Sequence, residues 1–403
     1  MSARLGGLDG RVVVVLVLAV YLAAAAVGGS QQWKRVHEPV ETPSFLDMRS
    51  LTSAWECSRK GVDPLPANPC DPHGRPANYP RIWLALRVFG LGDGAAIPLG
   101  IVNGAVFFLS ILLLVGRLRI LEGVVIAAAL CSPAVMFGVE RGNVDLTVVA
   151  LVCVGIALLR KQRVLAWVSS HALLLLAAVL KLFPVFALVV LARQSGRRLW
   201  LAALVAVLFA VDVIATLGDL KTIHRVLPQR VPLSYGVGVL SDGLSELHVL
   251  RTSAMSPHSL SHVIAAALVV IGAALAWLLN RRAPIRLLDD GLTLRTDAFY
   301  AGAATFVGTY VVTHNYDYRL ASLVLVLPLL MTRAGSTSPT RHTARIGIAL
   351  VIASLYVGGQ LWSTAFPWDE LVNWPLFVYL AAALIAGVST RRAGAGLRPE
   401  FGR

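Results

Sequence analysis

Residues 95–116 read AAIPLGIVNGAVFFLSILLLVG, and residues 120–138 read ILEGVVIAAALCSPAVMFG. The first stretch has no charged residue, and the second has only Glu122. A helix that crosses the hydrocarbon core of a bilayer needs about 20 mostly apolar residues, so each stretch is long enough to span a membrane. Because similar stretches recur along the chain, they decide the fold class.

The overall composition points the same way. Of the 403 residues, 57% are hydrophobic and 14% are charged, whereas a soluble domain averages about 25% charged residues. A soluble chain of this length could not bury so much apolar surface in its cores. The sequence therefore predicts an integral membrane protein.

Further apolar segments lie at 12–28, 144–159, 198–217, 261–280, 298–313, 318–332, 344–362 and 372–389. Between Val164 and Leu191, Lys181 and Pro184 interrupt an apolar stretch, which predicts two short helices that meet at a corner. The predicted fold is an all-α polytopic membrane protein, a single integral domain over residues 1–403 with roughly 12 transmembrane or broken helices.

The arginines and lysines indicate the topology. The chain has 36 Lys and Arg against 22 Asp and Glu, a net charge of +14, and the cations concentrate in alternate loops, as in cytoplasmic loops of membrane proteins. We therefore expect 281–297 and 333–345 to be cytoplasmic. Residues 29–94, with interfacial helices, and 218–260 become extracytoplasmic loops. The basicity is a topology signal, so we expect no nucleic-acid partner. A cleaved signal peptide at 12–28 is an alternative to an uncleaved first helix.

The cysteines and histidines carry weaker signals. Cys57 and Cys70 lie in the first outer loop, where a disulfide is compatible with an oxidising exterior. His258 and His262 have the i, i+4 spacing of a helical metal pair, but no third ligand is evident. We expect neither a metal nor a cofactor.

Polar residues at helix ends are the most informative local feature. Following the alternation of loops, one set emerges on the outer side: Asp47, Arg49, Glu140, Arg141, Asn143, Asp145, Lys181, His314, Asn315, Asp317 and Arg319. An ionisable group at the bilayer boundary costs a few kcal/mol unless it is paired or functional. Several segments thus converge on one membrane face, either as a functional site or as interfacial salt bridges.

Two members of this set have specific interpretations. Asp47 is either a general base at the membrane edge or the N-cap of a short amphipathic helix. Lys181 stands between apolar runs at a corner marked by Pro184, where a cation suits an anionic lipid phosphate. The alternative for Lys181 is a side chain that snorkels to the interface.

The order of several short motifs resembles the glycosyltransferase family 87 proteins of the GT-C superfamily. The motifs are Asp47, Gly61-Val62-Asp63-Pro64, Tyr79-Pro80, Asn143 at a helix start, and Lys181-Leu182-Phe183-Pro184. This family includes actinobacterial mannosyl- and arabinofuranosyltransferases of the cell envelope. Many relatives have Gly-Gln-x-Asn where this chain has Glu140-Arg141-Gly142-Asn143, and Tyr-Pro-Pro where it has Tyr79-Pro80-Arg81.

The resemblance implies a GT-C-like helix bundle in the plasma membrane with its site on the extracytoplasmic face. It implies a polyprenyl monophosphate sugar as donor, with mannose or arabinofuranose as the sugar, and an envelope glycan or glycolipid as acceptor. By resemblance the catalytic base is Asp47, and Tyr79 joins the polar set as a substrate-binding residue.

The chemistry fits the polar set. Displacement at an anomeric carbon needs a base for the acceptor hydroxyl and cations for the leaving phosphate. Asp47 supplies the first, and Lys181, Arg141, His314 and Arg319 supply the second. One prominent carboxylate favours direct inverting displacement, whereas Asp145, Glu140 and Asp317 leave a double displacement open. His314 is an alternative base. A lipid-linked sugar transporter or flippase without catalysis is the alternative function.

Overall fold

The structure, a computed structural model, describes residues 9–36, 42–227, 233–246, 257–282, 287, 293–312, 314–337, 339–361 and 367–395. The predicted outer loops 29–94 and 218–260 and the predicted cytoplasmic segments 281–297 and 333–345 lie partly outside these residues. The chain forms two compact units: unit 1 comprises Met1–Arg230 with Asp317–Ala321, and unit 2 comprises Val231–Tyr316 with Ser322–Arg403.

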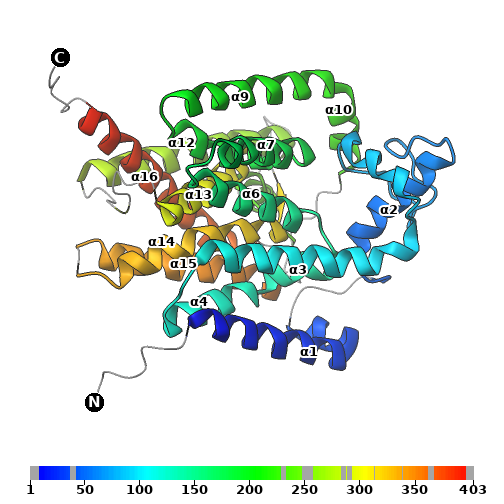
Figure 1. Cartoon of the computed structure of the whole chain (residues 1–403), viewed down its shortest axis with the longest axis horizontal. Coiled ribbons are helices and arrows are strands. Elements are labelled where there is room, and N and C mark those ends of the chain that lie inside the picture. Colours follow the sequence, from blue (N-terminus) through cyan, green and yellow to red (C-terminus); the bar gives the residue numbers. More distant parts are fainter. Residues whose placement is uncertain are drawn as a thin grey trace. The chain divides into compact units, whose positions relative to one another are not determined.

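Unit 1 is helical (Figure 1). Its elements are α1 (Gly10–Val36), α2 (Leu46–Arg59), η1 (Arg81–Phe89), η2 (Asp93–Ala95), α3 (Ala96–Val115), α4 (Ile120–Leu130), α5 (Pro133–Arg141), α6 (Asp145–Leu159), α7 (Val164–Leu180), η3 (Phe183–Leu188), α8 (Val189–Ala192), α9 (Arg197–Ala215) and α10 (Leu217–Val226). Helix α6 packs between α3 and α7, so apolar residues of α6 such as Leu146 and Ile156 are fully buried.

Unit 2 is also mainly helical. Its elements are β1 (Ser234–Tyr235), α11 (Val237–Glu246), α12 (Pro257–Arg282), α13 (Leu294–Val312), β2 (Asn315–Tyr316), α14 (Leu327–Ala334), α15 (Arg341–Leu361) and α16 (Glu370–Ala395). Helix η5 (Asp317–Val326) begins in unit 1 and ends in unit 2. Strands β1 and β2 pair antiparallel, with Ser234 opposite Tyr316.

Five of the described helices are long and apolar enough to cross a membrane. They lie at Gly10–Gly28, Asp93–Val115, Arg197–Ala215, Ser259–Arg281 and Glu370–Gly387. Helices α4 and α5 form a sixth candidate span, bent by 53° at a short break. The predicted fold is thus confirmed in part: the described residues are mainly helical, apart from the two-residue strands β1 and β2, and include helices that could span a membrane. The count of about twelve spans and the topology stay predictions.

The predicted corner at Lys181 is confirmed. Helix α7 ends at Leu180, Lys181 adopts extended backbone angles, and η3 begins at Phe183 with Pro184 in its first turn. Proline suits the first turn of a helix because its missing N–H would have no partner there. The chain therefore turns at Lys181 and leaves this side chain beside the start of α6.

A disulfide, buried side chains and two indole hydrogen bonds hold the first loop against the rest of unit 1. A disulfide joins Cys57 in α2 to Cys70, with a Cα–Cα distance of 5.7 Å. Helix α2 buries most of its side chains, including Leu46, Leu51 and Trp55. The Trp55 indole donates a hydrogen bond to the carbonyl of Trp83 (2.7 Å), whose own indole donates to the carbonyl of Leu180 (3.0 Å). Helices α2 and η1 are thereby fixed to the end of α7.

Candidate functional site

Asp47 lies in the first turn of α2 but does not cap it. The residue before the helix is Phe45, and no side-chain hydrogen bond caps this end. Phe45 has φ of 58°, a left-handed conformation that is rare for a bulky side chain. Such strain persists only where the surroundings impose it, and it concentrates at functional sites. Because Phe45, and not Asp47, is the N-cap residue of α2, the N-cap interpretation of Asp47 is wrong. The Asp47 carboxylate is available for another role.

One oxygen of Asp47 is held by Asn143. The Asn143 amide Nδ2 donates to Asp47 Oδ2 at 2.6 Å, while Asn143 Oδ1 accepts the backbone N–H of Asp145 at 2.9 Å. The second bond fixes which end of the amide faces Asp47. The Asp47 side chain keeps 18% of its surface exposed, so its other oxygen is open to an incoming group.

Asn143 is itself held in place from behind. Asn103 of α3 donates from Nδ2 to the Asn143 carbonyl at 2.8 Å, and Thr147 of α6 donates to Asn103 Oδ1. Asn103 and Asn143 are buried. This chain of hydrogen bonds connects α3 and α6 to the Asp47 carboxylate. Asn103 is not among the site residues predicted from the sequence, because it lies inside an apolar helix with no charged neighbour.

Gly142 allows the turn before Asn143 to approach α2. Its φ is +60°, and a Cβ at this position would lie 3.0 Å from Phe45 Cδ1 and 3.1 Å from Met48 Cβ. The N–H of Phe45 donates to the carbonyl of Glu140 at 3.2 Å. Only glycine fits both the backbone angle and the space, so the Gly142-Asn143 pair brings an amide close to Asp47.

A second carboxylate, Asp145, holds two cations. Lys181 Nζ lies 2.8 Å from Asp145 Oδ1, and Arg319 Nε lies 3.2 Å from Asp145 Oδ2. The Asp145 side chain is 2% exposed, against 12% for Lys181 and 17% for Arg319. Lys181 therefore turns inward to an ion pair rather than away to an interface. The three groups come from α6, the corner after α7, and the first turn of η5.

Tyr79 lies against this group of charges. Lys181 Nζ sits 4.7 Å from the centre of its ring, a cation–π arrangement. Burial raises the pKa of the Tyr79 phenol well above its usual value, and the negative charges of Asp47 and Asp145 raise it further. The phenol therefore stays protonated and remains a hydrogen-bond donor over the physiological range.

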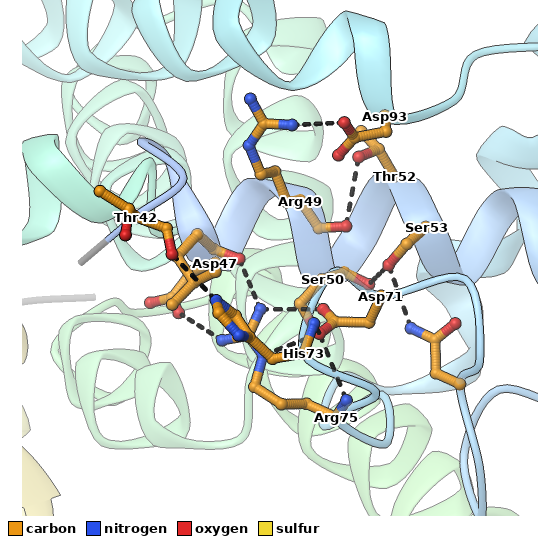
Figure 2. A network of polar contacts seen from close by, with 12 residues as sticks. Thr42, Asp47, Arg49, Ser50, Thr52, Ser53, Asp71, His73, Arg75 and Asp93 are labelled. Carbon is orange, nitrogen blue, oxygen red and sulfur yellow. Dashed lines mark hydrogen bonds and ion pairs between the residues drawn. The ribbon is translucent and has the colours of Figure 1, made fainter.

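Arg75, which the sequence analysis had not identified, approaches Asp47 from the first loop (Figure 2). Its Nη1 lies 4.0 Å from Asp47 Oδ1. Asp71 holds the guanidinium with two hydrogen bonds, from Nε (3.1 Å) and Nη2 (2.9 Å). The i, i+4 spacing of Asp71 and Arg75 in a loop rich in Pro and Gly was the only signal available in the sequence.

Other predicted site residues have different partners. Arg49 forms an ion pair with Asp93, and Figure 2 shows it on a different side of α2 from Asp47. Two positions along a helix turn a side chain by about 200°, which accounts for the separation. Arg141 Nε lies 3.6 Å from Glu140 Oε2, and its guanidinium covers the ring of Phe137.

Three predicted residues lie around β2. In unit 2, His314 Nε2 is 2.8 Å from Asp242 Oδ2, and the Asn315 amide donates to the carbonyl of Thr309 at 2.7 Å. Asp317 belongs to unit 1, where it is buried in the first turn of η5. The tertiary structure thus brings Asp47, Tyr79, Asn143, Asp145, Lys181 and Arg319 into one cluster within unit 1, together with Arg75 and Asp71. We call these eight residues the Asp47 cluster.

Within the described part of the chain, no three His, Cys, Asp or Glu side chains are grouped closely enough to hold a metal ion. The side chain of His258, half of the predicted histidine pair, lies outside the described residues. A scan against protein-family models and searches of curated proteins and solved structures find no match to this chain.

Proposed function

We propose that this protein is a membrane glycosyltransferase. It transfers mannose or arabinofuranose from a polyprenyl monophosphate donor to a glycan or glycolipid acceptor on the extracytoplasmic face of the plasma membrane. The observation that carries the proposal is the Asp47 cluster. A carboxylate with one oxygen held and the other open lies beside two cations that share a second, buried carboxylate.

Asp47 is suited to act as the general base. Asn143 fixes the carboxylate through Oδ2, so Oδ1 can accept a proton without losing that hydrogen bond. Partial exposure lets a substrate hydroxyl come within the distance of about 2.6–3.2 Å that proton transfer requires. Tyr79 remains a phenol, so it can donate a hydrogen bond but cannot replace Asp47 as the base.

Lys181 and Arg319 are suited to hold the leaving phosphate. Asp145 orients both cations through ion pairs, and Lys181 carries three N–H donors, so its ammonium group can bind a phosphate oxygen as well. Charge-assisted hydrogen bonds to a phosphate are about twice as strong as neutral ones. Because no bond to the lipid tail is needed for this step, the polyprenyl chain can stay in the bilayer while the phosphate is bound.

The same geometry favours direct displacement with inversion. A double displacement needs a second carboxylate that attacks the anomeric carbon. Asp145 is 2% exposed and engaged by two cations, so it is poorly placed to act as a nucleophile. We therefore expect one step, in which the configuration of the transferred sugar inverts.

The decisive test uses purified full-length protein in lipid nanodiscs with labelled polyprenyl-phosphate mannose and polyprenyl-phosphate arabinose. Asp47→Asn should reduce the transfer rate by at least the factor of about 10²–10⁴ that a general base contributes. The matched control is Asp93→Asn, the same chemical change on the other side of α2, which should stay within about threefold of wild type.

Three outcomes would contradict the proposal. A variant Asp47→Asn that retains more than about a tenth of the wild-type rate would exclude this residue as the base. Consumption of neither donor by wild-type protein would contradict glycosyl transfer. Movement of intact donor across the bilayer of sealed vesicles without loss of its sugar would instead establish a flippase.

A further inference from the structure

The guanidinium of Arg75 is rigidly held but incompletely used. Beside its two bonds to Asp71, its Nη2 donates to the carbonyl of Leu46 at 2.8 Å. Asp71 is buried and also accepts the backbone N–H groups of His73 (2.9 Å) and Arg75 (3.2 Å). The loop therefore fixes the plane and direction of the guanidinium before any ligand arrives.

Nη1 of Arg75 is the group that faces Asp47. Among the residues that the structure describes, Nη1 donates no hydrogen bond, and its 4.0 Å distance to Asp47 Oδ1 is too long for one. Both side chains keep solvent access, 32% exposed for Arg75 and 18% for Asp47. A donor and an acceptor thus face each other across a gap that is open to a small polar group.

The 4.0 Å gap between Arg75 Nη1 and Asp47 Oδ1 is wide enough for one oxygen atom to bond to both groups. A hydroxyl oxygen at about 2.7 Å from Oδ1 and about 2.9 Å from Nη1 satisfies both hydrogen bonds, because these lengths together exceed the 4.0 Å separation. The group must donate to Asp47 and accept from Arg75, which a hydroxyl does. A phosphate or carboxylate oxygen would meet the negative charge of Asp47 and is disfavoured.

We infer that Arg75 and Asp47 together hold the acceptor hydroxyl, so that Arg75 is a specificity-determining residue for the acceptor. The inference rests on the proposed function and extends it to the second substrate. The hydrogen bond from Arg75 engages one lone pair of the hydroxyl oxygen and leaves the other lone pair for the bond to the anomeric carbon.

Transfer of the sugar breaks two bonds and forms two. The O–H bond of the acceptor breaks and its proton passes to Asp47 Oδ1, while the oxygen forms a bond to the anomeric carbon. The bond from that carbon to the phosphate oxygen breaks, and the polyprenyl phosphate leaves with the electron pair. Arg75 is neither acid nor base in this step. It supplies a hydrogen bond that places the reacting oxygen.

The test measures acceptor and donor dependence separately. Wild type, Arg75→Gln, Arg75→Lys and the control Arg81→Gln are assayed in nanodiscs with the two labelled polyprenyl-phosphate sugars and octyl α-D-mannopyranoside as acceptor probe. Arg81 is in the same loop but pairs with Asp63 and Asp219. We expect Arg75→Gln to raise the acceptor KM at least tenfold and leave the donor KM within twofold. Arg81→Gln should leave both KM values within twofold of wild type.

The lysine variant separates a local role from a folding defect. Arg75→Lys keeps a positive charge beside Asp71 but lacks the fork that reaches toward Asp47, so it should melt near the wild-type temperature and still show a raised acceptor KM. An unchanged acceptor KM in a folded Arg75 variant, with Asp47→Asn inactive, would overturn this inference and leave the proposed function standing. Two results would refute the proposed function: wild type that transfers no sugar from either donor, to the probe or to water, or an Asp47→Asn variant that remains active. This inference would then fail with it.

Discussion

Removing the Asp145 carboxylate should destabilise unit 1 strongly, because it leaves Lys181 and Arg319 without their shared counter-charge. Breaking a buried ion pair by removing one partner costs about 3–5 kcal/mol. Since Lys181 and Arg319 keep 12% and 17% of their side-chain surface exposed, water compensates them in part. We therefore expect Asp145→Asn to lower the free energy of unfolding by about 3 kcal/mol, the lower end of that range.

The assay is thermal unfolding in one detergent at one scan rate, followed by tryptophan fluorescence. In a unit of about 235 residues, 1 kcal/mol shifts Tm by about 2–4 °C, so Asp145→Asn should lower Tm by about 6–12 °C. The matched control is Asp63→Asn, which removes a carboxylate from an ion pair with Arg81 in which both side chains are more than 40% exposed. Exposed pairs contribute about 0–1 kcal/mol, so this control should shift Tm by less than about 4 °C.

A double variant tests the cause. If the cost comes from a stranded lysine, Asp145→Asn combined with Lys181→Met should be more stable than the sum of the two single changes predicts, by at least about 1 kcal/mol. Two results would refute the reasoning: an Asp145→Asn variant that melts within 2 °C of wild type, or strictly additive effects in the double variant. Either would mean that the ion pair contributes no more than an exposed one.

Three further predictions address other parts of the molecule. Asn103→Leu removes the amide behind Asn143, so the transfer rate should fall about tenfold or more while the acceptor and donor KM values stay near wild type, as expected for a residue that positions the base; a purely structural role would lower Tm without this selective loss of kcat. Burial raises the pKa of Asp369, just before α16, from 3.8 to about 7. The folded state therefore binds more protons than the unfolded state between about pH 4 and 7, and stability falls as pH rises through this window. Asp369→Asn should abolish that part of the fall in Tm between pH 5 and 8, and an unchanged slope would contradict the assignment. Finally, cysteines at the exposed positions Ala85 and Gln162 should react with a membrane-impermeant maleimide from opposite sides of the membrane, Ala85 from outside, because Arg160, Lys161 and Arg163 predict a cytoplasmic loop around Gln162. Reaction of both from the same side would refute the predicted topology.

Much of the secondary structure could be predicted because long apolar runs in the sequence indicate that the surrounding solvent is a lipid bilayer. In a bilayer, backbone polar groups must be satisfied within the helix, so long apolar runs such as 95–116 and 261–280 can form little else. The corner at Lys181 followed from a charge and Pro184 interrupting such a run. The helical membrane character of the protein was determined at this level, from residue order alone.

The candidate site could be predicted only in part. Asp47, Asn143, Asp145, Lys181 and Arg319 were identified because charged or amide groups at the ends of apolar helices are costly unless they serve a purpose. Their partners were not identifiable. The sequence does not show that Asp145 is the carboxylate that pairs with Lys181, or that Asn143 rather than a cation binds Asp47. Both depend on contacts between residues that are far apart in the chain, with separations of 36 to 174 positions among the cluster's contacts.

Arg75 and Arg49 show most clearly what only the tertiary structure decided. In the sequence Arg49 is the nearer cation to Asp47, but a separation of two residues turns it to another side of α2, toward Asp93. Arg75 lies 28 residues away, yet Asp71 and the carbonyl of Leu46 direct it toward the same carboxylate. Helix formation depends on neighbouring residues and on the surrounding solvent, so the sequence determines it. The direction of a guanidinium depends on distant hydrogen-bond acceptors, and those meet it only after the chain has folded.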